Sequence, residues 1–420
     1  MKDRNENRPG YKKTKVGWIP EEWPTVMFDD ICERLREPVR IDLKKKYREI
    51  GIRSHGKGLF HKDQVNGIDL GNKAVFWVQS PALVFNIVFA WEQAVAVTSE
   101  REQGMIASHR FPMYGAKHSE AILDYVFRFF LSKRGKHLLG LASPGGAGRN
   151  KTLGQLELHK LLIPLPPIQE QRKITEILFA CDKTISLTRK LVKAKKRRKK
   201  ALMQQLLTGK TGLRGFSDPW KEFSLGELAT IIFSNVDKKA NNNEIPIRLC
   251  NYTDVYYNDR ITNDLDLMKA TATNIEIKKY KLSKNDVIIT KDSETAGDIA
   301  IPCCVAEEVK DIVCGYHLAI IRPRPEKIFG PFLSYLLMKD QVHYQFVRIA
   351  NGVTRFGLTN SSVKKIMVSI PSVNEQRIIH KVLSTADEEI EALQAKLSAL
   401  EKQKRGLMQK LLTGEVRVTP

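Results

Sequence analysis

The chain has 420 residues, which is long enough for two or three domains with cores of their own. Its 69 lysines and arginines outnumber 47 acidic residues and give a formal net charge of +22, while 42% of the residues are hydrophobic. This composition excludes a disordered chain and predicts a folded, basic protein. A polyanion is the expected partner, and nucleic acid is the first candidate.

Cysteine spacing and apolar runs indicate the compartment. The six cysteines form no CxxC pair, and the charged N-terminal sequence "MKDRNENRPGYKKTK" contains no apolar signal segment. The longest apolar run, "PALVFNIVFA" at 81–90, is shorter than the roughly 18 residues of a membrane span. We therefore expect a cytoplasmic protein without a membrane segment, in which this run forms a buried strand.

The first globular region, 1–165, has the α+β pattern of short apolar strands and one helical stretch. Strands are predicted at "AVFWV" (74–78), "LVFNIVFA" (83–90) and "KLLIPLP" (160–166), and a helix at "AILDYVFRFFLSKRGKHLL" (121–139). Trp91 is expected in the core of this region.

Two loops of this region carry candidate DNA contacts. The stretch "RSHGKG" follows the strand-like "YREIGI" and supplies donors suited to guanine and phosphate. These candidates are Arg53, Ser54, His55 and Lys57. A second candidate is Arg149 in the glycine-rich "GGAGRNKTL", as a phosphate contact. A polar surface hairpin and an arginine in an ordinary turn are the alternatives.

A first long helix is predicted over 166–210, after the proline turn "LPPIQE" and before Gly209. Its apolar seam contains Ile174, Leu178, Ile185, Leu202 and Leu206. The window 183–200 holds ten lysines or arginines and no acid, which is more typical of a solvated face than of a binding site.

The second globular region, 211–370, repeats the α+β pattern. Strands are predicted at "DVIIT" (286–290), "LAIIRP" (318–323) and "KIMVSIP" (365–371), and a helix at "GPFLSYLLMKDQVHYQF" (330–346). Its candidate base contacts, with an amide suited to adenine, are Arg248, Asn251, Tyr252 and Tyr256. Arg355, in a glycine-rich loop, is a candidate phosphate contact. A polar surface hairpin and an arginine in an ordinary turn are again the alternatives.

A second long helix is predicted over 371–414, followed by a short tail at 415–420. Its apolar residues follow a 4-3 spacing, which is typical of a coiled coil. They include Ile379, Leu383, Ile390, Leu397, Leu407 and Leu411. Antiparallel pairing of the two helices would set the basic residues 195–199 against Asp387, Glu388 and Glu389. The alternative is two separate surface helices, each packed on its own domain.

The two long helices are copies of one segment. "LMQQLLTG" at 202–209 returns as "LMQKLLTG" at 407–414, and the offset of 205 holds back to "EQR" at 170–172 and 375–377. Weaker echoes align Trp23 with Trp220 and the G-x-x-R of Gly146 and Arg149 with that of Gly352 and Arg355. We therefore expect two similar globular domains and two long helices in an antiparallel coiled coil, related by an approximate two-fold axis.

The domain order, the "LPP-x-x-EQ-x-x-I" helix entry and the "L-M-x-x-L-L-T-G" helix exit resemble the specificity subunit of type I restriction–modification systems. This resemblance implies two target-recognition domains, each reading one half of a bipartite double-stranded DNA site. It implies that the helices set the unread spacer and dock two methyltransferase subunits, with restriction subunits in the full assembly. No catalysis and no cofactor are expected in this chain, and S-adenosylmethionine, Mg²⁺ and ATP would bind to the partners.

Catalytic and metal signals are weak. No N/D-P-P-Y/F methyltransferase motif is present. Asp298, Glu308 and Lys310 resemble the pattern of a metal-dependent nuclease, an acid followed by E-x-K, but their spacing is loose. Cys303, Cys304, Cys314 and His317 do not have a standard zinc-ligand spacing, and the three cysteines are expected to be buried in strands. The remaining alternatives are a specificity subunit of a stand-alone methyltransferase and a coiled-coil scaffold with nonspecific DNA binding.

Overall fold

The computed structural model describes residues 5–71, 73–117, 119–145, 151–209, 213 and 215–418. The chain divides into two compact units, and each contains one globular region with parts of both long helices. The first unit comprises Met1–Arg189 and Ala395–Pro420, and the second comprises Lys190–Gln394. The two long helices therefore contribute to the packing of both units.

The first unit is built on two four-stranded sheets, with strand orders β6-β5-β10-β7 and β4-β11-β8-β9, and two small antiparallel pairs, β1–β2 and β3–β12. Its strands are β1 (Tyr11–Thr14), β2 (Gly17–Pro20), β3 (Thr25–Met27), β4 (Cys32–Leu35), β5 (Lys46–Ile52), β6 (Leu59–Asn66), β7 (Val75–Trp77), β8 (Leu83–Phe85), β9 (Val95–Val97), β10 (Ile106–Ser108), β11 (Met113–Ala116) and β12 (Leu162–Pro164). Its short helices are α1 (Phe28–Ile31), α2 (Gly67–Leu70), α3 (Leu123–Leu131), α4 (Lys133–Leu141) and α5 (Gln155–His159), with 3₁₀ turns η1 (Ala90–Glu92) and η2 (Glu100–Glu102).

The strand predicted over 83–90 is wrong in its second half, because β8 ends at Phe85. The Asn86 side chain accepts a hydrogen bond from the Val88 backbone at 3.1 Å and turns the chain, as asparagine commonly does. The apolar residues that follow lead into η1, and Phe89 is 38% exposed. An apolar run thus became a short strand, a turn and a 3₁₀ helix.

Each predicted globular helix is broken in two. In the first unit, Ser132 adopts an extended conformation between α3 and α4, and its hydroxyl accepts a hydrogen bond from the Gly135 backbone at 3.0 Å. In the second unit, Lys339 is extended between α10 (Gly330–Leu337) and α11 (Asp340–Ile349). A serine that caps a new helix explains the first break, since capping satisfies the amides at the helix start.

The second unit contains a five-stranded sheet in the order β14-β22-β18-β20-β16 and a three-stranded sheet in the order β17-β15-β21, with the pairs β13–β24 and β19–β23. Its strands are β13 (Lys221–Ser224), β14 (Ala229–Phe233), β15 (Ile245–Cys250), β16 (Arg260–Ile261), β17 (Met268–Ala272), β18 (Val287–Thr290), β19 (Asp292–Ser293), β20 (Pro302–Val305), β21 (Ile312–Cys314), β22 (Leu318–Pro323), β23 (Phe356–Gly357) and β24 (Met367–Ile370). Its other short helices are α7 (Leu225–Leu228), α8 (Tyr252–Tyr256), α9 (Asn274–Tyr280) and α12 (Asn360–Lys364), with the 3₁₀ turn η3 (Ala296–Asp298). Every residue of the central strand β18 is buried.

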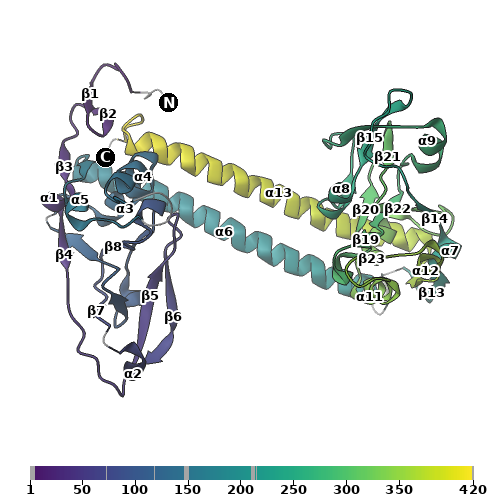
Figure 1. Ribbon diagram of the computed structural model, residues 1–420, viewed down its shortest axis with the longest axis horizontal. Coiled ribbons are helices and arrows are strands. Elements are labelled where there is room, and N and C mark those ends of the chain that lie inside the picture. The colour runs from purple at the N-terminus through teal and green to yellow at the C-terminus, as the bar shows by residue number, and fades with distance from the viewer. Residues whose placement is uncertain are drawn as a thin grey trace. The chain divides into compact units, whose positions relative to one another are not determined.

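The long helices are α6 (Ile168–Leu206) and α13 (Val373–Leu412), drawn in teal and yellow in Figure 1. Each follows a proline-containing turn, and each is followed by a glycine, Gly209 or Gly414, with φ of +68°. A residue in this left-handed conformation commonly terminates a helix, and glycine adopts it without steric cost.

Within each unit the two long helices run antiparallel. In the first unit, Asp182 pairs with Lys404 and Arg189 with Glu401. In the second, Lys195 pairs with Glu389 and Lys199 with Asp387. Residue numbers fall along α13 as they rise along α6, so the basic segment of α6 lies against the acidic start of α13. The residues predicted for the helix-pair interface are all buried or half-buried, namely Ile174, Leu178, Ile185, Leu202, Leu206, Ile379, Leu383, Ile390, Leu397, Leu407 and Leu411.

A tryptophan, a glutamate and a glycine join helix to domain in both units. In the first unit, Trp23 donates to Glu170 at 3.1 Å, and a Cβ on Gly414 would lie 3.3 Å from the Trp23 ring. In the second, Trp220 donates to Glu375, and a Cβ on Gly209 would lie 2.9 Å from the Trp220 ring. The echo that aligned the two tryptophans therefore marks equivalent junctions.

The C-terminal segment after α13 packs into the first unit. Arg417 donates to both carboxylate oxygens of Glu170, at 2.8 and 2.9 Å, and its guanidinium lies 5.6 Å from the centre of the Trp23 ring. Asn5 and Tyr11 donate to the backbone of Thr413 and Gly414.

Among the described helices, none combines the length and apolar character that crossing a membrane requires.

Candidate nucleic-acid interface

In the first unit, the predicted contact stretch forms the turn of the β5–β6 hairpin. His55, Gly56 and Gly58 all adopt positive φ, between +60° and +76°, and so produce a tight turn. The side chains of His55 and Lys57 are exposed at this turn. They are therefore available to an external ligand.

The other two candidates at this turn have partners within the protein. Arg53 donates to the Leu59 carbonyl at 2.8 Å, and its guanidinium lies 4.8 Å from the centre of the Phe60 ring. Ser54 donates to the Glu92 carboxylate at 3.0 Å. The fifth candidate of this region, Arg149, lies outside the residues that the structure describes.

In the second unit, Arg248 is committed to the fold. Its guanidinium donates to the Asn263 and Lys310 carbonyls, each at 2.8 Å, and pairs with Asp311 at 3.1 Å. These bonds hold β15 and the loop before β21 together. The sequence predicted Arg248 as a DNA contact, whereas in the structure its guanidinium donates to other residues of the second unit and braces the fold.

Three tyrosines gather on and beside α8. The rings of Tyr252 and Tyr256 stack with centres 5.5 Å apart, and Tyr257 packs edge-on against Tyr256 at 5.0 Å. The Tyr256 hydroxyl donates to Asp298 at 2.9 Å, while Tyr257 is 77% exposed. Asn251 begins the helix as its N-cap residue, and its backbone amide donates to Asp254 at 2.7 Å. Tyr257 was not among the predicted contacts, although it is the most exposed ring of the group.

Arg355 joins a polar cluster at the end of β18. Its guanidinium donates to Asp292 and lies within hydrogen-bond distance of the His317 ring, each at 2.9 Å. The loop before it needs a glycine, because Gly352 has φ of +134° and a Cβ there would lie 1.9 Å from the Arg355 carbonyl oxygen. The Arg355 side chain is 59% exposed, so it is both oriented by Asp292 and open to solvent.

Two residues that the sequence did not single out extend this cluster. The Lys291 ammonium lies 4.4 Å from the centre of the Tyr316 ring, and Tyr316 packs edge-on against His317 at 4.8 Å. Burial lowers the pKa of Lys291, against the opposing effect of Asp292. Tyr316 is 50% exposed. A cation, an exposed ring and an oriented arginine together form a surface suited to a nucleic-acid backbone.

In the part of the chain that the structure describes, no three His, Cys, Asp or Glu side chains form a group that could hold a metal ion. Cys303, Cys304 and Cys314 are buried in strands. The Asp298 carboxylate accepts hydrogen bonds from Thr295 and Tyr256, and these lower its pKa.

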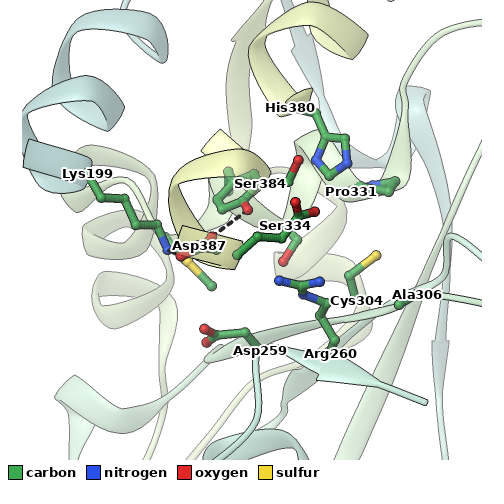
Figure 2. A pocket seen from close by; sticks show the side chains of 13 residues that line it. Lys199, Asp259, Arg260, Cys304, Ala306, Pro331, Ser334, His380, Ser384 and Asp387 are labelled. Atoms are coloured by element: carbon green, nitrogen blue, oxygen red, sulfur yellow. Dashed lines mark hydrogen bonds and ion pairs between the residues drawn. The ribbon is translucent and has the colours of Figure 1, made fainter. Parts of the chain in front are cut away.

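The second unit also contains a cavity where the globular region meets both long helices. It has a volume of about 190 Å³, and Figure 2 shows the side chains that line it. Lys199 and Tyr335 converge on Asp387, with donor–acceptor distances of 2.5 and 2.6 Å, and Arg260 reaches Glu391 at 3.0 Å. Burial raises the pKa of Tyr335, and its hydrogen bond to Asp387 adds to this effect. These contacts fix the globular region of the second unit to its helices.

Comparison with known proteins gives one consistent family. The family described as type I restriction modification DNA specificity domain matches residues 83–194 and 217–402. A putative type I restriction enzyme MjaX specificity subunit from Methanocaldococcus jannaschii is 23% identical, over 97% of each chain. The EcoBI specificity subunit from Escherichia coli is 24% identical, over 83% of this chain and 70% of that protein.

Solved structures agree on the fold. The HsdS subunit from Thermoanaerobacter tengcongensis superposes with a TM-score of 0.54 at 19% identity, over 95% of this chain and 98% of that one. The type I S subunit from M. genitalium superposes with a TM-score of 0.55 at 15% identity, over 93% and 96% of the chains. The family match covers about half of the first globular region, most of the second and most of both long helices, and therefore more than half of the chain. The chain thus belongs to the type I restriction–modification DNA specificity subunits.

Proposed function

We propose that the two globular regions each read one half of a bipartite DNA site. The observation that carries this proposal is the presence of exposed polar and aromatic side chains on a compact globular region in both units. Tyr257, Tyr316 and Arg355 supply them in the second unit, and His55 and Lys57 in the first. Basic side chains would bind phosphates, and the turn and tyrosine groups would approach base edges.

The long helices serve as the spacer. A helix of 39 residues, as in α6, is about 58 Å long at 1.5 Å per residue, and one turn of B-DNA is about 34 Å. A helix pair of this length can leave base pairs unread between two recognised words. Adding or removing a heptad in one helix is therefore expected to change the spacer or abolish function.

The helices also offer surfaces for partner proteins. Phe179 and Leu187 of α6 are 61% and 56% exposed in the first unit, and Ile378 of α13 is 43% exposed in the second. Apolar side chains exposed on helices are typical of protein interfaces. In our proposal two methyltransferase subunits dock here, with restriction subunits in the full assembly. S-adenosylmethionine, Mg²⁺ and ATP would be bound by those partners, and this chain would not be catalytic.

The test is selection from a randomised duplex pool by the chain together with its methyltransferase subunit. Two short enriched words separated by a fixed unread gap are expected. Exchange of residues 1–165 for the equivalent region of a relative should then change only one of the two words. Enrichment of no sequence, or a change in both words after the exchange, would contradict the two-reader proposal.

A further inference from the structure

A basic hollow of about 560 Å³ opens on the first unit beside the β5–β6 turn. Its walls include Trp91 from η1, Lys133, Lys136 and His137 from α4, and Lys151. No acidic side chain is among the described residues that line it. Trp91 was expected in the core, but it is half-buried and lines this hollow, since β8 ends early and η1 brings its ring to the surface. We call this feature the Trp91 hollow.

The α4 wall is set by helical spacing. Lys133, Lys136, His137 and Gly140 are spaced at i, i+3, i+4 and i+7, so they share one helix face. Gly140 leaves the wall open, because a Cβ added there would meet no atom within 4 Å. Glycine weakens a helix interior by about 1 kcal/mol relative to alanine. Gly140 therefore costs some helix stability, but it leaves space in which a ligand can approach the helix backbone closely.

The floor of the hollow is held in place and is continuous with the hairpin turn. The Trp91 indole donates to the Val88 carbonyl at 3.2 Å, and the Lys151 ammonium lies 5.5 Å from the ring centre. The backbone amides of His55 and Gly56 donate to the carbonyls of residues 92 and 93, at 2.7 and 3.0 Å. The turn is therefore hydrogen-bonded to the two residues that follow Trp91 in the chain.

We propose that the Trp91 hollow binds the sugar–phosphate backbone of the duplex next to the bases that the β5–β6 turn approaches. This assignment rests on the proposed function of the first globular region. The α4 lysines match phosphate oxygens, while the indole face and Leu141, which is 64% exposed, match the apolar side of deoxyribose. The hollow supplies affinity and register, and the choice of bases stays with the turn.

The experiment compares two variants of the Trp91 hollow with a charge-matched control, all in complex with the methyltransferase subunit. Lys133→Ala/Lys136→Ala removes two charges from the hollow, and Gly140→Glu places a carboxylate inside it. Lys44→Ala/Lys45→Ala removes two exposed charges from the loop at the opposite end of the hairpin. Binding to the selected duplex is measured over a series of salt concentrations, together with the thermal midpoint and the words enriched from the random pool.

The double lysine variant should bind three- to tenfold more weakly at moderate salt, and its slope of log affinity against log salt should fall by about 1.8, at about 0.9 per phosphate. Gly140→Glu should weaken binding at least as much with an equal or higher thermal midpoint, because the position is open and helical. The enriched words should be unchanged. The control should have less effect on the salt slope than the lysine pair of the hollow.

Three outcomes would overturn the assignment while leaving the proposed function standing. The first is an unchanged salt slope in the variants of the Trp91 hollow, and the second is an equal loss of affinity in the control. The third is new enriched words in the variants of the Trp91 hollow, which would show that the hollow contacts bases. If the wild-type complex enriches no word at all, the proposed function itself fails. The two failures are therefore distinguishable in one data set.

Discussion

The ammonium group of Lys199 in α6 lies 2.5 Å from the Asp387 carboxylate in α13, and the same pairing joins Lys404 to Asp182 in the first unit. One offset of 205 residues relates the two lysines and the two aspartates. Each copy of the repeated segment contains one such aspartate and one such lysine. Because the helices pair antiparallel, the lysine of each copy forms an ion pair with the aspartate of the other copy. This ion pair explains why a lysine, Lys404, can stand in the apolar seam of α13.

Removal of the Lys199–Asp387 pair should be costly. Both side chains are largely buried, at 16% and 13% exposed, so a double-mutant cycle of Lys199→Ala and Asp387→Ala should give a coupling energy of about 1–3 kcal/mol. The same cycle on the more exposed Arg189–Glu401 pair should give under about 1 kcal/mol. Urea unfolding measures both. Equal coupling energies would mean that burial does not strengthen the pair.

The helix-ending glycines should not tolerate a side chain. Gly414→Ala introduces a Cβ 2.4 Å from Pro20 at a φ of +68°, and we expect a loss of about 1–3 kcal/mol in the free energy of unfolding. Gly406→Ala, within α13 and with nothing within 4 Å, should instead gain about 0.5–1 kcal/mol. A shift of the unfolding free energy in the same direction for both substitutions would show that backbone conformation does not decide which glycine is required.

The C-terminal arginine should stabilise the first unit. Arg417→Ala leaves Glu170, whose side chain is only 4% exposed, without its charged partner. A loss of about 1–3 kcal/mol is expected, since a buried carboxylate would lose two charge-assisted hydrogen bonds. Arg405→Ala, at an exposed position of α13, is the control. Urea unfolding followed by Trp fluorescence should show the effect, and no difference from the control would refute it.

Acid should weaken the β5–β6 hairpin through Glu49. Burial raises the pKa of this carboxyl, but hydrogen bonds from Lys73 and Lys62 more than offset the effect, so the net pKa lies below the ordinary 4.5. Its contribution to stability is therefore present above pH 4.5 and is lost as the pH falls through the folded-state pKa. Glu49→Gln should flatten the acid limb of the stability–pH curve, whereas Glu33→Gln, at an exposed position on β4, should not.

Arg355 should contribute one phosphate contact. Arg355→Ala is expected to weaken binding a few-fold and to reduce the salt slope by about 0.9, without changing the enriched words. The Arg355 side chain is 59% exposed, so the unfolding free energy should change by less than about 1 kcal/mol. The exposed Arg348 of α11 serves as the control. A changed word would assign Arg355 to base reading instead.

Patterns within a single segment of the sequence predicted where the two long helices begin. The starts of α6 and α13 lie within two residues of the predicted 166 and 371, because proline turns, a 4-3 apolar spacing and terminal glycines act locally along a helix. The strand predicted over 83–90 and the unbroken helix predicted across Ser132 were wrong, because a single asparagine or serine side chain accepts a hydrogen bond from a nearby backbone amide and redirects the chain.

The sequence by itself determined the repeat, the long helices and the charge contrast that favours antiparallel pairing, since each is written in residue spacing and type. Only the tertiary structure decided which candidate contacts remain available. Arg248 is occupied by Asn263, Lys310 and Asp311, and Trp91 comes to the surface against α4. The partners in both cases are distant in the chain, and burial and hydrogen bonding depend on which distant segments the fold brings together.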